Sequence, residues 1–234
     1  RYNLHNLHGY PHFLPGLCTV TTTSKQPRNA IESARRTIEL ELRAVEQLQH
    51  RIDESFTHAV ELLSAVKGRV IVSGMGKSGH IGNKIAATLA STGTPAQFVH
   101  PAEACHGDMG MITRSDAALL MSNSGTTAEI TALLPLLKRL GLPIVAMTGN
   151  PDSTLARAAD AHLNISVDEE ACPLDLAPTA STTANLVMGD ALAIAMLEQS
   201  GFTAEDFAFT HPGGALGRRL LTRVSDVLVT GSDI

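Results

Sequence analysis

The amino-acid sequence predicts an α/β domain with a mostly parallel sheet that is flanked by helices on both faces. Short apolar stretches alternate along the chain with segments of helical periodicity, which is the pattern of repeated strand–helix–strand units. Two of the predicted strands are each followed by a glycine- and hydroxyl-rich turn that leads into a helix, at residues 74–80 and 122–129. A hydrophobic fraction of 44% in 234 residues is enough to fill the core of such a fold.

The N-terminal part of the chain differs from the rest. Residues 1–27 contain no acidic residue and no periodic apolar pattern, so we expect an arm, a targeting leader or a cloning remnant in front of a domain at 28–234. From Ala30 to Val66, apolar residues recur mostly at steps of three and four, with charged residues between them. This pattern predicts a hairpin-like helical segment that precedes the sheet and ends at Gly68.

The rest of the domain follows as alternating strands and helices. Apolar runs predict strands at 69–73, 96–99, 117–121, 143–147 and 161–165. Helical periodicity predicts helices at about 77–91, 127–140, 153–158 and 181–199, the last of them stopped by Gly201. Ligands of parallel sheets bind at the carboxyl ends of the strands, so we expect a site where the two turns lie.

The turn at residues 122–129, S-N-S-G-T-T-A-E, is the most informative feature of the sequence. It stands between a predicted strand and a predicted helix, where unpaired backbone amides and the positive end of the helix dipole converge. Its hydroxyl groups, with no acidic residue before Glu129, suit a phosphate group as the ligand. The alternative is an ordinary helix cap, because Thr126 and Glu129 alone would form a T-x-x-E capping box.

The turn at residues 74–80, G-M-G-K-S-G-H, also follows a predicted strand. It does not match a P-loop, and no acidic residue ends the next strand as the dinucleotide-binding pattern requires. Lys77 is a cation on this turn that could reach a phosphate or a developing oxyanion. The alternative for Lys77 is a solvated side chain, although the dipole at a helix start disfavours a positive charge there.

Composition excludes several classes of function. A net charge of −5 gives no general attraction for polyanions, and aromatic residues make up only 3% with no tryptophan, so we expect no nucleic-acid partner. No apolar run reaches the ~18–20 residues of a membrane span, so we expect no membrane partner. Three widely spaced cysteines, Cys18, Cys105 and Cys172, indicate reduced thiols in a cytoplasmic protein.

Further motifs make the chain similar to a known family. The turn at 122–129 resembles the signature S-x-S-G-x-T/S-x-E of sugar isomerase (SIS) domains. Together with six other segments, it resembles the arabinose 5-phosphate isomerases over about residues 30–234. The six segments are G-M-G-K-S-G-H-I-G at 74–82, S-T-G-T-P at 91–95, H-P-A-E-A-C-H-G-D-M-G-M at 100–111, P-T-A-S-T-T at 178–183, V-M-G-D-A-L-A at 187–193 and F-T-H-P-G-G-A-L-G-R at 209–218. Many members of that family continue into a pair of CBS domains, which would begin near residues 227–231 of this chain.

The resemblance implies a fold, an activity and an assembly. The fold would be the SIS-type three-layer sandwich. The activity would be the reversible conversion of D-ribulose 5-phosphate into D-arabinose 5-phosphate through an enediol, which supplies Kdo and lipopolysaccharide biosynthesis. The resemblance also implies a cytoplasmic homotetramer with sites shared between subunits, and no cofactor.

The chemistry of this reaction assigns roles to residues. A proton must move between C1 and C2 of the sugar, which requires a carboxylate or imidazole base, and another proton must move between the two oxygens. Glu129 lies one helical turn beyond the phosphate turn and could be that base if it is buried enough to hold a proton near neutral pH. With the resemblance, the predicted catalytic residues are Lys77, His106, Glu129 and His211, with His211 reaching into the pocket of a neighbouring subunit.

The resemblance extends to the substrate-binding residues. The phosphate would be held by Ser78, Ser122, Ser124, Gly125, Thr126, Thr127 and Thr182. Gly76 and Glu103 would contact the sugar. No metal is required, although Cys105, His106 and Asp108 could bind an adventitious transition metal on residue type alone.

Two other classes of function stay open on the sequence. A non-catalytic SIS sugar-phosphate sensor would use the same turn, but it should lack the acid–base residues and usually carries a helix-turn-helix segment, which this sequence does not show. An isomerase of another ketose phosphate is the closer alternative, because residue types fix neither the carbon number nor the stereochemistry of the substrate.

Overall fold

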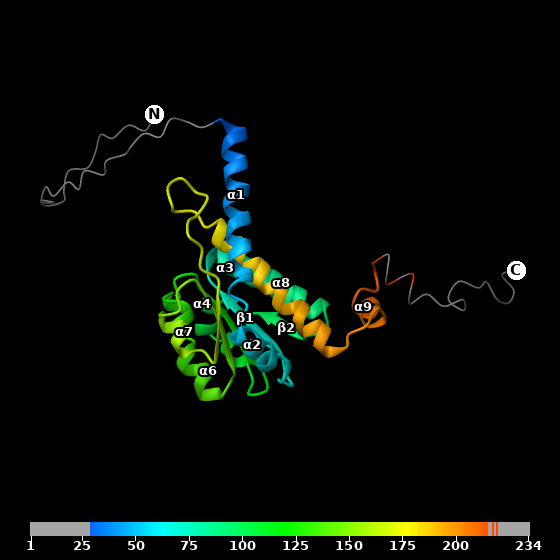
Figure 1. Ribbon diagram of the computed structural model, residues 1–234. Helices are drawn as coiled ribbons and strands as arrows, with labels where there is room; N and C mark the ends of the chain where they lie inside the picture. The colour runs from blue at the N-terminus through cyan, green and yellow to red at the C-terminus, as the bar shows by residue number, and fades with distance from the viewer. Residues whose placement is uncertain (1–28, 215–216, 218, 220–234) are drawn as a thin grey trace, which may run out of the picture.

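Five parallel strands, in the order β2-β1-β3-β4-β5, form the centre of the fold (Figure 1). They are β1 (Val70–Gly74), β2 (Ala96–Phe98), β3 (Ala117–Met121), β4 (Ile144–Thr148) and β5 (Ala161–Asn164). The structure, a computed structural model, describes residues 29–214, 217 and 219, so the predicted arm at 1–27 lies outside the described residues. All five predicted strands are confirmed, and their ends shift by no more than a residue.

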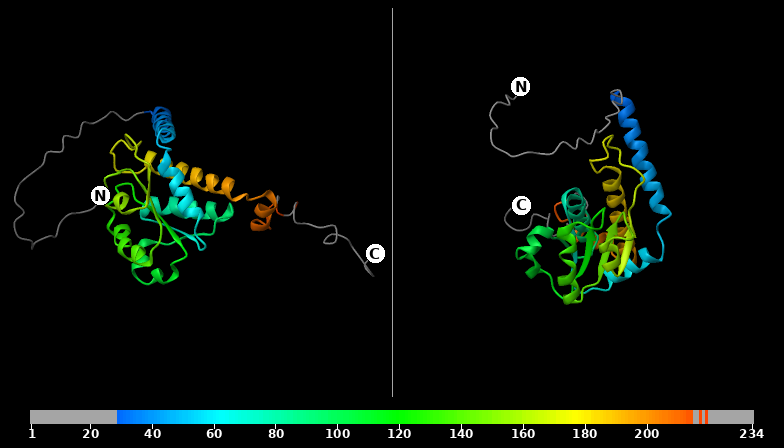
Figure 2. Two further views of the ribbon diagram at one scale, coloured as in Figure 1. Left: turned by 60° about the horizontal axis from the view of Figure 1, so that its bottom comes forward. Right: turned by 90° about the vertical axis from the view of Figure 1, so that its left-hand side faces the viewer.

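One face of the sheet is covered by three helices, α2 (Glu54–Ser64), α3 (Gly76–Ser91) and α8 (Ala180–Ser200). Their apolar side chains and those of the sheet form one buried cluster. α3 and α8 are in close contact at Gly189, where a Cβ atom would lie 2.3 Å from the Ile85 side chain. The two helices lie side by side over this face (Figure 2).

The opposite face is covered by four short helices, α4 (Pro101–Cys105), α5 (Ala128–Thr131), α6 (Leu134–Leu140) and α7 (Thr154–Ala158). A second buried cluster joins these helices to the sheet. Neighbouring residues of one strand, such as Leu119 and Leu120, belong to different clusters because side chains alternate between the two faces of a sheet. The predicted fold class, a parallel sheet between two helical layers, is therefore confirmed.

The predicted hairpin-like segment forms two helices, and one other predicted helix is interrupted. The segment predicted as helical over 30–66 forms α1 (Ala30–Gln49) and α2, with Asp53 capping the start of α2 through a hydrogen bond from Ser55 N. The predicted helix at 127–140 forms α5 and α6, because Pro135 in the first turn of α6 has no amide to continue the helical ladder. α1 extends away from the sandwich, and its buried residues lie in its C-terminal half (Figure 1).

Two helices, α8 and α9 (Ala204–Thr210), form the C-terminal part of the described chain. Among the described residues, α8 alone has the length and the mean hydropathy (1.3) of a membrane span, but half of that stretch is buried inside the domain, as in a core helix. α9, which was not predicted, follows α8. The connection between them passes the amino end of β2, since a Cβ atom at Gly93 would lie 2.4 Å from the Phe202 ring.

Candidate active site

The two glycine- and hydroxyl-rich turns leave the sheet side by side. β1 and β3 are neighbouring parallel strands, with Gly74 opposite Met121 at their carboxyl ends. The chain passes from β1 to β2 on one side and returns to β3 on the other, so this edge is the switch point of the sheet. The start of α3 and the residues after β3 therefore meet where a parallel sheet binds its ligand.

The residues after β3 form a hydroxyl turn (residues 122–127) in which the side chains converge. Ser122 Oγ lies 2.7 Å from Thr127 Oγ1 and accepts a hydrogen bond from Gly125 N at 3.0 Å. Ser124 Oγ accepts hydrogen bonds from the amide and the hydroxyl of Thr126, at 3.3 and 3.2 Å. Four hydroxyl groups are thus gathered at the carboxyl end of β3, where they can face a bound oxyanion.

The hydroxyl turn is braced by the loop after β4. Gly125 has a φ of +66°, and a Cβ atom there would lie 2.0 Å from Ser153 Oγ, so only glycine fits. One backbone hydrogen bond joins the loop to the turn, from Gly149 N to Asn123 O at 2.9 Å, and a second comes from the first turn of α7, from Leu155 N to Gly125 O at 3.0 Å. The conformation of the turn therefore depends on its neighbour as well as on its own sequence.

The helix cap that was the alternative for this turn is not found. α5 begins at Ala128, its N-cap is Thr127, no side chain caps it, and Glu129 is its second residue. The hydroxyls of Thr126 and Thr127 bond to the serine hydroxyls of the turn instead. The capping-box interpretation is therefore wrong, and the amides of Ala128 and Glu129 find no acceptor among the described residues. The start of α5 is thus open to an anion.

A second helix start lies beside the first. α3 begins at Gly76, and its N-cap, Met75, makes no side-chain capping bond. Lys77 follows as an exposed residue that forms no ion pair within the described part of the chain, and Ser78 behind it is half-buried. A cation at a helix start is electrostatically unfavourable unless an anion binds nearby. Lys77 and the two open helix starts are therefore a candidate anion site.

The segment after β2 borders the same edge of the sheet. α4, a short helix that was not predicted, contacts α5 and carries Glu103, and His106 is its C-cap. Both side chains are exposed. In the residues that the structure describes, no three His, Cys, Asp or Glu side chains come together as a metal site. The metal alternative for Cys105, His106 and Asp108 therefore gains no support in the single chain.

The side chain of Glu129 is exposed. The burial that a base at this position would need is therefore not provided by the single chain, because Glu129 stands in the first turn of α5, outside the core that Ile130 enters. Bound substrate or a second chain would have to exclude water around its carboxylate.

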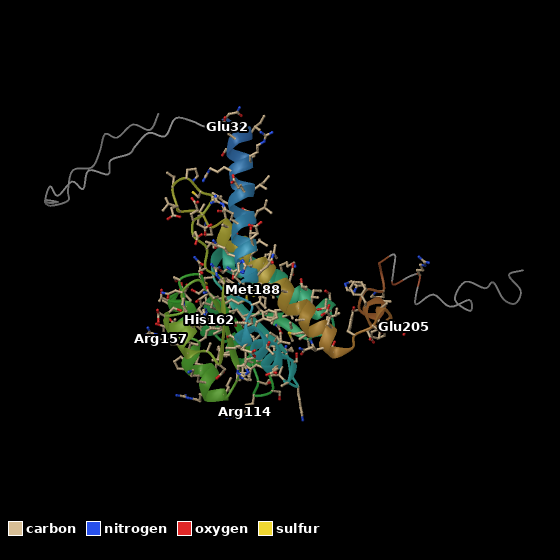
Figure 3. The ribbon with its side chains drawn as sticks, viewed as in Figure 1. Glu32, Arg114, Arg157, His162, Met188 and Glu205 are labelled. Atoms are coloured by element: carbon tan, nitrogen blue, oxygen red, sulfur yellow. The ribbon has the colours of Figure 1, made fainter. Side chains whose placement is uncertain are left out.

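The structure places His211 away from the hydroxyl turn of its own chain. His211 ends α9, and its ring stacks on Phe207 at a centroid distance of 4.0 Å. α9 lies beyond the amino end of β2, whereas the hydroxyl turn lies at the carboxyl ends of the strands. In Figure 3, Glu205 on α9 and Arg157 on α7 lie on opposite sides of the domain. One chain alone does not bring His211 to the site.

The start of α8, where Thr182 lies, is already occupied by a carboxylate. Glu170 accepts hydrogen bonds from Thr179 N at 2.7 Å and from Ser181 N at 3.3 Å. Burial alone would raise the pKa of Glu170, but the hydrogen bonds from Ser181 and Thr179 outweigh burial and hold that pKa below its usual value. The Thr182 hydroxyl donates to Thr179 O at 2.8 Å. Its contact with phosphate stays a prediction.

No sequence-based prediction included the loop after β4 in the site. The segment T-G-N-P-D-S at 148–153 begins with the last residue of the buried strand β4 and leads into α7, with Ser153 as the N-cap. This strand–turn–helix pattern is the same as that of the hydroxyl turn. This pattern is the signal by which the loop could have been recognised. The role of the loop is to support the hydroxyl turn.

The chain is similar to known proteins in sequence. Residues 62–195 match the family described as SIS domain. The chain is 67% identical over 204 residues to the arabinose 5-phosphate isomerase KdsD of Pseudomonas aeruginosa, a match that covers 87% of this chain and 63% of that protein. It is 58% identical over 203 residues to KdsD of Escherichia coli K12, with 87% and 62% covered. The chain thus spans less than two thirds of the length of these curated relatives.

A solved structure extends the comparison to a bound ligand. An Escherichia coli CFT073 protein in complex with arabinose 5-phosphate is 44% identical to this chain and superposes with a TM-score of 0.75. The match covers 78% of this chain and 97% of that one.

Proposed function

Because the chain belongs to the SIS domain family, we propose that it is an aldose–ketose isomerase that interconverts D-ribulose 5-phosphate and D-arabinose 5-phosphate through an enediol. The 67% identity to KdsD and the 44% identity to a protein solved with arabinose 5-phosphate support this choice of substrate. The observation that carries the proposal is the pair of open helix starts at the switch point, with Lys77 on one helix and Glu129 on the other. Isomerisation of a sugar phosphate requires a proton-transferring group beside an anion site.

In this proposal the hydroxyl turn and the first amides of α5 hold the phosphate of the sugar, with Ser78 beside them. Glu129 moves a proton between C1 and C2. Lys77 stabilises the negative charge on the enediolate oxygen. His106 and His211 move the second proton between O1 and O2. Gly76 and Glu103 contact the sugar, and the reaction needs no cofactor.

The proposed assembly is a homotetramer in which His211 acts in the site of a neighbouring subunit. Its place at the far edge of the sheet supports this, because only another copy could bring a His211 to a given hydroxyl turn. α1 supports association as well, since Ile31, Ile38 and Leu42 are 58–61% exposed along a helix that extends from the domain. Exposed apolar patches of this kind mark contacts between proteins.

The proposed location is the cytoplasm. The two cysteines among the described residues, Cys105 and Cys172, are free thiols, as in a reducing compartment. The product, D-arabinose 5-phosphate, would supply Kdo and lipopolysaccharide biosynthesis.

A coupled assay with a panel of pentose, hexose and heptose phosphates tests the proposed activity. We expect the fastest turnover with D-ribulose 5-phosphate and D-arabinose 5-phosphate. Turnover confined to a hexose or heptose phosphate would favour the related isomerase. Binding of a sugar phosphate without turnover of any member of the panel would favour the sensor.

A further inference from the structure

A buried hydrogen-bond unit joins the end of β4 to β5, next to the site. Thr148, the last residue of β4, is fully buried. Its hydroxyl oxygen lies 2.9 Å from Asn150 O, 3.1 Å from Asn150 N and 2.9 Å from Nε2 of His162. A hydroxyl has one proton to donate and two lone pairs to accept, so these three contacts use its full capacity. No position is left for water.

This unit fixes the first residues of the loop that braces the hydroxyl turn. Asn150, bound to the Thr148 hydroxyl through both its amide and its carbonyl, directly follows Gly149, whose amide donates to Asn123 O. A Cβ atom at Gly149 would lie 2.8 Å from Asn123 Oδ1, so the loop and the turn are in close contact. A change in the conformation of residues 148–150 must therefore move the hydroxyl turn.

His162 holds the other side of the unit. Its backbone is anchored to the first turn of α2, because Ser55 Oγ donates to His162 O at 2.8 Å and accepts from His162 N at 3.2 Å. Figure 3 shows His162 within the body of the domain. The ring is therefore held in place independently of the loop, and it offers a fixed partner to the Thr148 hydroxyl.

We propose that Thr148, held by His162, is a positioning residue for phosphate binding. Its hydroxyl fixes residues 149–153, and through them it keeps the hydroxyl turn in the geometry that binds phosphate. The inference rests on the proposed function only for the identity of the ligand. Without the hydroxyl, Asn150 and His162 lose a buried partner, so the loop must rearrange. A small displacement of the turn then weakens its contacts with phosphate.

The test compares three variants of the full chain: Thr148→Val, Thr148→Ser and Thr92→Val. Thr148→Val keeps the shape of the side chain but removes the hydroxyl, which Thr148→Ser restores. Thr92 is the matched control: it is also buried, its hydroxyl donates to Thr88 O at 2.8 Å, and it ends α3 at the opposite edge of the sheet. The measurements are the affinity for inorganic phosphate by calorimetry, the thermal unfolding midpoint, and kcat and KM.

We expect Thr148→Val to weaken phosphate binding and raise KM about fivefold or more, with kcat within about twofold of the parent. Thr148→Ser and Thr92→Val should keep the parental affinity. Parental phosphate affinity in a folded Thr148→Val chain, or an equal loss in Thr92→Val, would overturn the inference. If Thr148→Val does not fold, His162→Phe carries the same expectation and the same overturning result.

The two proposals fail in different ways in this experiment. The predicted pattern of phosphate affinities in a chain without isomerase turnover would refute the isomerase and leave the positioning role standing. A parent chain that binds no inorganic phosphate would overturn the positioning role itself. Turnover together with unchanged phosphate affinity in Thr148→Val would refute the positioning role alone.

Discussion

The hydroxyl turn and the predicted acid–base residues of the candidate site differ in whether one chain alone brings their groups together. The hydroxyls of the turn bond to one another, and the loop after β4 braces the backbone of the turn. Lys77, His106 and Glu129 are exposed at the same edge of the sheet, and His211 lies at the other edge. The candidate anion site is thus built within one chain, whereas one chain does not gather the predicted catalytic residues.

This difference separates binding from chemistry. Binding of phosphate needs amides and hydroxyls that the backbone around β3 and β4 fixes locally, so a single chain can prepare them. Proton transfer works best where water is excluded, and exposed side chains reach that condition only when substrate or another subunit covers them. Variants in the two regions should therefore differ in what they lose. Substitutions in the hydroxyl turn should weaken phosphate binding, whereas substitutions of the predicted catalytic residues should lower turnover.

The largest expected effect is the loss of turnover in Glu129→Gln. Gln keeps the size of the side chain but cannot accept a proton from carbon, and loss of a general base costs about 10²–10⁴-fold in rate. The variant should remain folded and bind sugar phosphate, as kcat and KM in the coupled assay would show. Glu54→Gln, an exposed residue in the first turn of α2, is the control and should be silent. Parental turnover in Glu129→Gln would remove Glu129 from the chemistry.

Mixing two inactive variants tests whether one site combines residues from opposite ends of the strands in different subunits. If each site takes Glu129 from one subunit and His211 from another, Glu129→Gln and His211→Ala chains that are refolded together should regain about a quarter of the parental turnover. Random assembly gives an intact pair of residues in that fraction of the sites. Turnover no higher than that of the separate variants would place both residues of a site on one chain.

Ser124→Ala tests the hydroxyl turn, whose groups one chain brings together. The Ser124 hydroxyl accepts two hydrogen bonds from Thr126 within the turn, and in the proposed complex it bonds to the phosphate. Loss of one hydrogen bond to a charged group costs about 1.5–3 kcal/mol, or roughly 10- to 150-fold in affinity. The expected result is a higher KM with little change in kcat. Ser91→Ala removes a hydroxyl that donates to Thr88 O at the far end of α3, and it should leave KM unchanged.

The smallest expected effect concerns pH. Burial lowers the pKa of His162 from its usual 6.5, while the backbone at Thr148 and the charge of Asp53 act in the opposite direction. The unfolded chain therefore binds this proton at a higher pH than the folded chain. Stability should fall as the pH drops below about 6.5, until the folded pKa is passed. His162→Gln should show a shallower loss of the unfolding midpoint over this range, with the exposed His50→Gln as the control.

Much of the fold could be predicted because its signals are local. The strands are short apolar runs buried on both faces, as Leu119 and Leu120 in the clusters on opposite faces of β3 show, and such runs are visible in sequence. The hydroxyl turn was predicted for the same reason, since a strand, a glycine and a helix start follow one another. The break at Pro135 was missed because the apolar periodicity continues across it, and periodicity outweighed the signal of one proline.

The unpredicted parts of the site depend on contacts between distant segments. The exposure of Glu129 cannot be derived from its neighbours in sequence, because it depends on which elements cover the start of α5. The bracing of Gly125 by Ser153 joins two loops from adjacent strands, which are far apart along the chain. The position of His211 beyond the amino end of β2 follows from the path of the chain after α8, for which the sequence holds no periodic signal.

The central claim is that this chain moves a proton on the carbon skeleton of a pentose phosphate, with Glu129 as the base. Solvent deuterium incorporation at C1 or C2 of ribulose 5-phosphate, followed by NMR in the parent and in Glu129→Gln, tests it most directly. We predict exchange in the parent and strongly reduced exchange in Glu129→Gln, although both bind the ligand. Equal exchange in both chains would contradict the assignment of the base, and a parent that binds ribulose 5-phosphate without any exchange would contradict the isomerase.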